Sequence, residues 1–370
     1  MRYLIFCFLF FIQRVDAQSS QQKDINELKK SISSLFDGAW IQHQFSGVLL
    51  VAKNGKPLYF QSKGYRDFNN KTSLNKNDIF ELASVSKQFT SMIIMMLKER
   101  GMLGYDDPLE RYIKDLPYKG ITLRHLLTHT SGLPDYQNIM DQHWDKNKIA
   151  DNEDIIDYLK KYPEAVHFAP GEKYEYSNTG YVLLASVAEI ASKIEFKEMV
   201  KKWIFTPLKM KSADFRTPAS RSKVHNFAKG FIYDTTSHKY APADSFKESN
   251  YTIWLGNRKG PGRISMNAAD LLKWDQALYT PLLIAATTMD EAFTPYTLNN
   301  GTTIGYGFGW ELKQNLKLGK VVHHSGDNPG YHTHIMRYID KKYTVILLNN
   351  NASDQMNNIL NAVEELLAKD

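Results

Sequence analysis

Runs of β-forming residues lie near both ends of this chain, and helical periodicity fills the stretch between them. Residues 47–52 and 58–60 are short apolar runs, and between them Asn54 and Gly55 form a dipeptide typical of a β-hairpin turn. Further runs of this kind come late in the sequence, at residues 308–312, 320–323, 334–338 and 343–348. We therefore expect the first and last strands to join one mostly antiparallel sheet.

Apolar residues recur at helical spacing through the middle of the chain and at both margins. Helices are predicted within residues 24–37, 89–97, 123–127, 155–159, 181–190 and 357–367, the first ending near Gly38. The expected fold class is α/β (α+β): a mostly antiparallel β-sheet flanked by helices, with a second, mainly helical lobe. The sheet lobe would comprise about residues 24–85 and 255–370 and the helical lobe about residues 86–254, with the site in the cleft between them.

The first residues have the features of a secretory signal peptide. Arg2 precedes nine apolar residues at positions 4–12, which are too few to span a bilayer, and Ala17 offers a small residue for cleavage. We expect residues 1–17 to be removed and residues 18–370 to form the mature domain in the periplasm or outside the cell, with no membrane-spanning segment. Cys7 is the only cysteine, so the mature chain would contain no thiol nucleophile, disulfide or thiolate metal site.

Charge argues against a nucleic-acid partner. The chain has 46 Lys and Arg against 40 Asp and Glu, a net charge of +6 that is spread along the sequence rather than gathered in a basic block. Neither of the glycine-rich loops that bind nucleotides occurs. We expect no cofactor, and a small molecule or peptide as the partner.

Ser84 and Lys87 form a Ser-x-x-Lys motif where an apolar-periodic helix begins. Side chains three residues apart share one face of a helix, so the Lys87 amine can approach the Ser84 hydroxyl and serve as its base. The helix N-terminus also presents N–H groups to a developing oxyanion. On its own the motif has a simpler interpretation, in which Ser84 caps the helix and Lys87 is solvated.

Two more motifs follow in the sequence. Tyr176 and Asn178 lie in a loop bounded by Pro170 and Gly171, ahead of an apolar helix, and residues 323–327 read His-His-Ser-Gly-Asp at the end of a β run. With these three motifs in this order, the chain resembles the serine β-lactamase and penicillin-binding-protein superfamily, in the branch of class C β-lactamases, DD-carboxypeptidases and related esterases. The resemblance runs over residues 47–350 and includes residues 125–133 and 306–310.

The resemblance implies roles for the residues of the first two motifs. Ser84 would be the acylated nucleophile and Lys87 its base. Tyr176 would relay a proton to the nucleophile or leaving group, and Asn178 would hydrogen-bond the substrate's amide side chain. Tyr174 is a rival phenol two residues away, and Tyr176 is preferred because the Tyr-Ser-Asn triplet is the part that matches.

The third motif departs from the commonest family pattern. His324 stands where many members have the Lys of Lys-Thr-Gly, and the resemblance implies that Ser325 and Gly326, which follow it, bind substrate. The backbone N–H groups of Ser84 and Asp327 would hold the oxyanion. Because imidazole is only partly charged near neutral pH, we expect His324 to attract a substrate carboxylate weakly. We also expect activity to fall on one side of neutrality, with an inflection that moves in a His324→Lys variant.

Other histidines and one arginine suggest further sites. A metal could be held by His323, His324, His332 and His334, but no acidic ligand pattern accompanies them, and we expect no metal. His125 and His129 lack the Glu of a His-Glu-x-x-His site, so we expect hydrogen-bonded structural rings. Arg263 follows Gly260, Pro261 and Gly262. Its cation could face a substrate carboxylate, or its side chain could be solvated at a tight turn, and turn chemistry favours the solvated side chain.

The residues and the resemblance together predict an exported serine hydrolase with a β-lactamase-related catalytic domain. It would form an acyl-enzyme on an amide or ester, with peptidase or esterase activity favoured over efficient penicillin hydrolysis because of His324. The alternatives are a true class C-like β-lactamase and a non-catalytic module that binds penicillin or cell-wall fragments.

Overall fold

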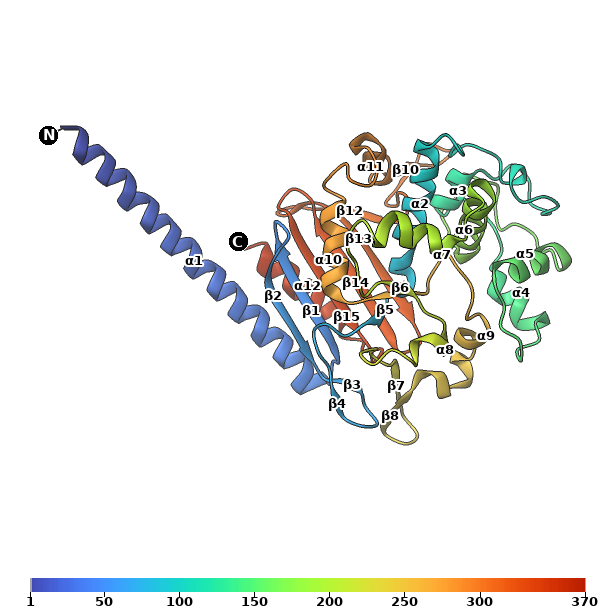
Figure 1. Cartoon of the computed structure of the whole chain (residues 1–370), viewed down its shortest axis with the longest axis horizontal. Coiled ribbons are helices and arrows are strands. Elements are labelled where there is room, and N and C mark those ends of the chain that lie inside the picture. Colours follow the sequence, from blue (N-terminus) through green and yellow to red (C-terminus); the bar gives the residue numbers. More distant parts are fainter. Residues whose placement is uncertain (1, 370) are drawn as a thin grey trace.

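The chain folds around a six-stranded antiparallel sheet whose strands come from both ends of the sequence (Figure 1). The computed structural model describes the backbone of residues 2–369 and the side chains of residues 23–369. The strands are β1 (Gly47–Lys53), β2 (Lys56–Lys63), β12 (Glu311–Asn315), β13 (Gly319–Asn328), β14 (Tyr331–Tyr338) and β15 (Tyr343–Asn349). Their order is β12-β13-β14-β15-β1-β2, so the predicted fold class and the pairing of the first and last strands are confirmed.

The β1–β2 hairpin turns where the sequence predicts it. Asn54 and Gly55 have φ angles of 52° and 72°, the left-handed values that both central positions of a type I′ turn require. On its other side β1 pairs with β15, where Leu49 lies opposite Leu347 and Val48 opposite Leu348. All four side chains are fully buried, because helices cover both faces of the sheet.

One face of the sheet packs against α1 (Arg2–His43) and α12 (Met356–Leu367). Ile32 and Phe36 of α1 and Val363 of α12 are fully buried there against Leu49 and Leu347. Figure 1 shows α1 running well beyond the body of the molecule toward the N-terminus. The predicted helix at 24–37 is therefore too short at both ends, since Gly38 continues α1. The signal-peptide prediction concerns residues 1–17, whose side chains lie outside the described residues.

The other face packs against the helical part of the chain. Val48 and Leu348 belong to one hydrophobic cluster with the buried side chains of α2 (Lys87–Glu99), α6 (Asn178–Ser192) and α10 (Ala268–Ala277). The other helices are α3 (Leu123–Leu127), α4 (Tyr136–His143), α5 (Asn152–Lys161), α7 (Phe196–Val200), α8 (Pro218–Arg221), α9 (Tyr251–Trp254) and α11 (Ala286–Ala292). The predicted helices after the first lie within α2, α3, α5, α6 and α12. The proposed lobe boundaries stay a prediction.

Short strands and single helical turns connect these elements. β5 (Phe80–Glu81), β9 (Ile264–Met266) and β6 (Asp214–Phe215) form a three-stranded sheet. The two-stranded pairs are β3 (Tyr65–Asp67) with β4 (Thr72–Ser73), β7 (Phe231–Asp234) with β8 (Lys239–Pro242), and β10 (Tyr296–Thr297) with β11 (Thr303–Ile304). The turns are η1 (Ala83–Ser86), η2 (Leu109–Arg111), η3 (Lys201–Phe205), η4 (Ala243–Ser245) and η5 (Lys247–Ser249).

One predicted strand begins later than expected. The run at 308–312 enters the sheet only at Glu311, because Gly309 has a φ of 77° and closes a turn before β12. Within the described part of the chain, no helix has the length and apolar character needed to cross a bilayer.

Candidate active site

Ser84 lies in η1, a single turn that is held between the sheet and α2. Leu82 N–H donates to Ile264 O at 2.9 Å, and Ile264 N–H donates back to the hydroxyl of Ser86 at 3.2 Å, so β9 fixes both ends of the turn. Ala83, immediately before Ser84, has a φ of 49°, a left-handed value that is rare for a residue with a side chain. Such backbone strain is found at sites where a side chain must be held in an unusual position.

The Lys87 amine is buried and lies 2.9 Å from Ser84 Oγ. It also donates to Asn178 Oδ1 at 2.8 Å and to Pro261 O at 3.2 Å. Desolvation, and then the nearby Arg258 charge, hold the pKa of Lys87 well below its usual value. The structure gives all three contacts with the amine as donor; when the amine is neutral it keeps two N–H donors, which Asn178 and Pro261 can accept, and its lone pair is then available to the Ser84 O–H. The alternative of a solvated Lys87 is wrong.

Tyr176 is the phenol that reaches the nucleophile. Its ring lies over Lys87, with Nζ 4.7 Å from the ring centroid. The residue is 41% exposed, yet desolvation raises the pKa of its phenol, and the neighbouring Ser84 hydroxyl opposes this only in part, so the phenol stays protonated at neutral pH. Tyr174 packs its ring against His129 and Tyr306 instead.

The Tyr-Ser-Asn loop is held in place by the cap of α6 and by a buried histidine. Ser177 Oγ accepts from Gly180 N–H at 3.2 Å, which fixes Asn178 as the first residue of the helix. Ser177 N–H in turn donates to Nδ1 of His129 at 3.0 Å. His125 accepts from Thr122 N–H at 3.2 Å. Both histidines thus have the structural hydrogen bonds that the sequence predicts.

A chain of hydrogen bonds connects His129 to the third motif through Tyr306. His129 accepts on Nδ1, so in its neutral form the proton is on Nε2, which lies 3.1 Å from Tyr306 Oη. The Tyr306 hydroxyl then donates to Nε2 of His324 at 2.9 Å, and His324 donates from Nδ1 to Ser325 O at 2.6 Å. The direction of each bond follows from the one before it.

This environment keeps His324 neutral. Desolvation, with the Lys87 charge, lowers the pKa of His324 to about 3. The expected inflection near neutrality therefore cannot come from His324. Its ring is buried, and its centroid lies 6.2 Å from that of Tyr176. Its hydrogen bonds go to Tyr306 and to its own strand, which makes it a positioning group among the predicted site residues.

The remaining residues of the third motif, on β13, alternate between exposed and buried positions. Ser325 and Asp327 are exposed, whereas Gly326 is buried between them. A Cβ on Gly326 would lie 2.2 Å from Leu82 O, because β13 packs directly on the turn that carries Ser84. Thr333 of β14 closes the same contact, with its hydroxyl donating to Leu82 O at 2.7 Å.

A pocket of about 70 Å³ opens beside the nucleophile. Three predicted site residues line it: Ser84, Asn178 and Asp327. Ser84 and Asp327 are the residues expected to supply the oxyanion N–H groups, and the pocket brings them together. Larger surface hollows exist, such as one of about 360 Å³ that Trp254 and Lys146 line. Ser84, Asn178 and Asp327 do not line that hollow.

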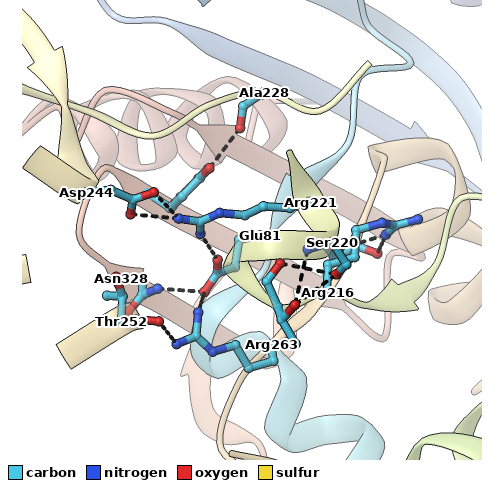
Figure 2. Close-up of polar contacts among 12 residues, drawn as sticks. Glu81, Arg216, Ser220, Arg221, Ala228, Asp244, Thr252, Arg263 and Asn328 are labelled. Carbon is cyan, nitrogen blue, oxygen red and sulfur yellow. Dashed lines mark hydrogen bonds and ion pairs between the residues drawn. The ribbon is translucent and has the colours of Figure 1, made fainter. Parts of the chain in front are cut away.

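Arg263 fits neither interpretation from the sequence. It is 2% exposed, with Nη1 3.5 Å from Glu81 Oε1 and Nη2 hydrogen-bonded to Thr252 O, so it is neither solvated nor a lining residue of the pocket. Figure 2 shows it meeting Glu81 from the side opposite Arg221. Among the described residues no group of three or more metal-ligand side chains gathers; His323 and His334 stack on each other.

Sequence reasoning missed three contributors to this site. Tyr306 belongs to a motif that carries the family resemblance, but nothing in the sequence shows that it joins two histidines. The carbonyl of Pro261 is a backbone group and leaves no sequence signal. Arg258 lines the pocket from a segment that the motifs do not include.

Comparison with known proteins gives consistent matches. The family model described as "Beta-lactamase" matches residues 32–369. Penicillin-binding protein 4* of Bacillus subtilis (strain 168) is 42% identical over 342 residues, which cover 92% of this chain and 76% of that protein. The octameric penicillin-binding protein homologue from Pyrococcus abyssi has a TM-score of 0.77 and 27% identity over 90% of this chain and 76% of its own. D-amino acid amidase from Ochrobactrum anthropi SV3, at 22% identity, shares the fold with a TM-score of 0.76 over 93% of this chain and 99% of its own.

Proposed function

The chain belongs to the β-lactamase family of serine hydrolases, and we propose that it is an exported enzyme that forms an acyl-enzyme through Ser84 with an amide or ester. Peptidase or esterase activity is favoured over efficient penicillin hydrolysis. The reason is that His324 is neutral and faces Tyr306, so this position offers no cation to a β-lactam carboxylate.

The observation that carries the proposal is the buried position of the Lys87 amine. It is within hydrogen-bond distance of Ser84 Oγ, while Asn178 and Pro261 take its two N–H groups. A buried amine with a lowered pKa, within hydrogen-bond distance of a hydroxyl, is the arrangement that a general base needs.

Acylation follows from these contacts. The Ser84 proton passes to Lys87 Nζ as Oγ bonds to the substrate carbonyl carbon, and the backbone N–H groups of Ser84 and Asp327 stabilise the oxyanion. When the bond to the leaving group breaks, the leaving atom takes the proton of the Tyr176 hydroxyl, and protonated Lys87 restores it. Water then attacks the acyl carbon, its proton returns to Ser84 through the same pair, and the acid is released.

Two variants test the assignment of the nucleophile. Ser84→Ala should lose at least about 10³-fold in kcat/KM on a 4-nitrophenyl ester, because no other described group occupies the Oγ position. Ser237→Ala, at an exposed turn between β7 and β8, is the matched control and should retain full activity. A fluorophosphonate should add its mass to wild type at Ser84. Unchanged turnover in Ser84→Ala would overturn the proposal.

The rates of hydrolysis of three substrate classes by the wild-type protein distinguish the candidate activities. Nitrocefin, a peptide ending in D-Ala-D-Ala and the nitrophenyl ester should be compared at equal enzyme concentration. Turnover of the ester or peptide with slow or no nitrocefin hydrolysis is expected. Fast nitrocefin hydrolysis would indicate a true β-lactamase, and a stable adduct without turnover would indicate a binding module.

Export is the second part of the proposal, and residues 1–17 support it by their composition. The expected mature protein begins at Gln18. N-terminal sequencing of protein recovered outside the cytoplasm checks this, and recovery of the uncleaved chain in the cytoplasm would contradict it.

A further inference from the structure

Glu81 lines the catalytic pocket, and two arginines outside the pocket lining share its carboxylate. Glu81 Oε2 accepts from Arg221 Nη1 at 2.8 Å, and Glu81 Oε1 lies 3.5 Å from Arg263 Nη1 (Figure 2). Arg221 also contacts both oxygens of Asp244, at 2.7 and 2.6 Å. Glu81 and Asp244 therefore balance the charges of Arg221 and Arg263.

Arg258 is different because it lacks an acidic partner. Among the residues whose side chains are described, no carboxylate oxygen lies within 4.0 Å of its guanidinium. Its one side-chain hydrogen bond goes from Nη1 to the hydroxyl of Tyr136 at 2.5 Å, and its buried Nε has no hydrogen-bond partner. A bound carboxylate would supply the close acidic partner that this guanidinium lacks.

The guanidinium lies close to the reacting groups. Arg258, Gly262 and Ser84 line the same pocket. A Cβ on Gly262 would lie 4.0 Å from Arg258 Nη2 and 3.9 Å from Ala83 O, so the bare glycine leaves space between the arginine and the nucleophile turn. The Arg258 charge also lowers the pKa of Lys87, which is consistent with a short separation.

The acidic groups that face the pocket are already paired or point outward. Glu81 lines it but is held by Arg221, Arg263 and Asn328, whose Nδ2 donates to Glu81 Oε1 at 2.6 Å. Asp327 lines the mouth with a side chain that is 82% exposed and lies 3.5 Å from His332 Nε2. Arg258 is the cation in the pocket wall without a carboxylate within 4.0 Å among the described side chains, and Glu81 acts on it only at longer range.

We propose that Arg258 is a specificity-determining residue that binds a carboxylate on the acyl portion of the substrate. The inference rests on the proposed acyl-enzyme function. It concerns the acyl portion because Asn178, which the family resemblance assigns to the substrate's amide side chain, lines the pocket with Arg258, whereas His324 does not. The substrate class is then an amide or ester whose acyl chain carries a negative charge. Arginine suits this task because its planar fork can hold both carboxylate oxygens.

The test compares charged and neutral acyl chains of equal length. Mono-4-nitrophenyl adipate and pimelate each carry a free carboxylate, and their methyl esters are the neutral counterparts. In Arg258→Gln, kcat/KM for the better anionic ester should fall roughly 10- to 100-fold relative to its methyl ester, the range expected for one hydrogen bond to a charged group. The ratio of the two esters removes any effect of Arg258 on the nucleophile, because that effect is common to both.

Two further variants separate a local from a general charge effect. Lys259→Gln removes the next cation along the chain, which is bonded to Glu189 at 2.6 Å and does not line the pocket, and it should leave the ratio unchanged. Arg258→Lys should keep part of the preference, since it keeps the charge and loses the fork. A wild-type ratio near 1, or equal loss on both esters in Arg258→Gln, would overturn the inference.

The role of Arg258 in binding a carboxylate can be tested even if the proposed acyl-enzyme function is wrong. If wild type hydrolyses neither ester, the acyl-enzyme proposal fails. The inference is then decided by calorimetric binding of the same esters to Ser84→Ala. Tighter binding of the anionic ester that Arg258→Gln abolishes would support a carboxylate site, and equal binding of both esters would refute it.

Discussion

At the scale of single residues, the catalytic chemistry depends on burying one amine without an acidic partner. Lys87 has three polar contacts, to Ser84, Asn178 and Pro261, and none of them is a carboxylate. A carboxylate there would favour the protonated amine and raise its pKa, whereas desolvation and Arg258 lower it. The sequence predicts the meeting of Ser84 and Lys87 from their spacing. It cannot predict the absence of an ion pair, which depends on Arg258 and Pro261, far along the chain.

The pH dependence of activity should follow this amine. Below the pKa of Lys87 the amine is protonated and cannot take the Ser84 proton, so kcat/KM on a neutral ester should fall as pH is lowered through that value. Its inflection should lie well below the usual lysine pKa of about 10.4. In Arg258→Gln the loss of a nearby positive charge should raise the pKa of Lys87 and move the inflection to higher pH.

The matched control for this pH profile is Lys259→Gln, whose cation is paired with Glu189. Its profile should coincide with that of wild type. An inflection in wild type at the ordinary lysine pKa, or one that stays in place in Arg258→Gln, would show that Lys87 is not the base or that Arg258 does not act on it.

At the scale of elements, the site exists because β13 packs directly on η1. Gly326 allows this contact, since any side chain would meet Leu82 O, and Thr333 holds Leu82 O from the next strand. The two predicted oxyanion groups, Ser84 and Asp327, lie on these two elements, and the pocket between them joins both. Their alignment is therefore a property of the strand-to-turn contact.

A Gly326→Ala substitution should disturb that contact. Its Cβ would lie 2.2 Å from Leu82 O and 2.4 Å from Thr333 Oγ1, so β13 and η1 must separate. We expect destabilisation of about 1–3 kcal/mol, as for other overpacked sites, and a loss of about 10²-fold or more in kcat from the displaced oxyanion donor. Urea unfolding and ester kinetics measure the two effects.

Gly38→Ala is the control, because a Cβ there has open space within the C-terminal part of α1 and alanine favours the helix. It should be as active as wild type and equally or more stable. If Gly326→Ala kept wild-type kcat, the oxyanion site would not depend on the packing of β13 against η1.

Local sequence specifies some helices and turns of this structure but not the hydrogen bonds that join them. The Asn54–Gly55 hairpin and helices α2, α3 and α5 follow from turn chemistry and periodicity, which act over a few residues. The Ser177–His129–Tyr306–His324 connection joins four separate stretches through single hydrogen bonds. Such contacts depend on tertiary packing, so motif order predicts the members of the site but not the hydrogen bonds between them.

At the scale of the whole molecule, the fold depends on joining the two ends of the chain. β1 completes the sheet by pairing with β15, and α1 with α12 covers the face opposite the catalytic helices. Among the described residues, the buried apolar side chains of α1 lie between Leu28 and Ala39. Within the described side chains of α1, those that support the sheet are thus close to the strand that follows the helix.

Two N-terminal deletions should therefore differ sharply. A chain that begins at Gln18 keeps Leu28, Ile32, Phe36 and Ala39, and it should melt within about 2 °C of the full-length protein. A chain that begins at Gln44 exposes the sheet face beneath α1, and burial of one large side chain contributes about 1.5–3 kcal/mol. Losing Leu28, Ile32 and Phe36 together removes several kcal/mol from a total stability of about 5–15 kcal/mol, so this chain should unfold or aggregate. Thermal melts followed by circular dichroism measure the stability of both chains. If both shortened chains melted at the temperature of the full-length protein, α1 would be dispensable. If the chain from Gln18 were destabilised, the residues before Gln18 would carry part of the core.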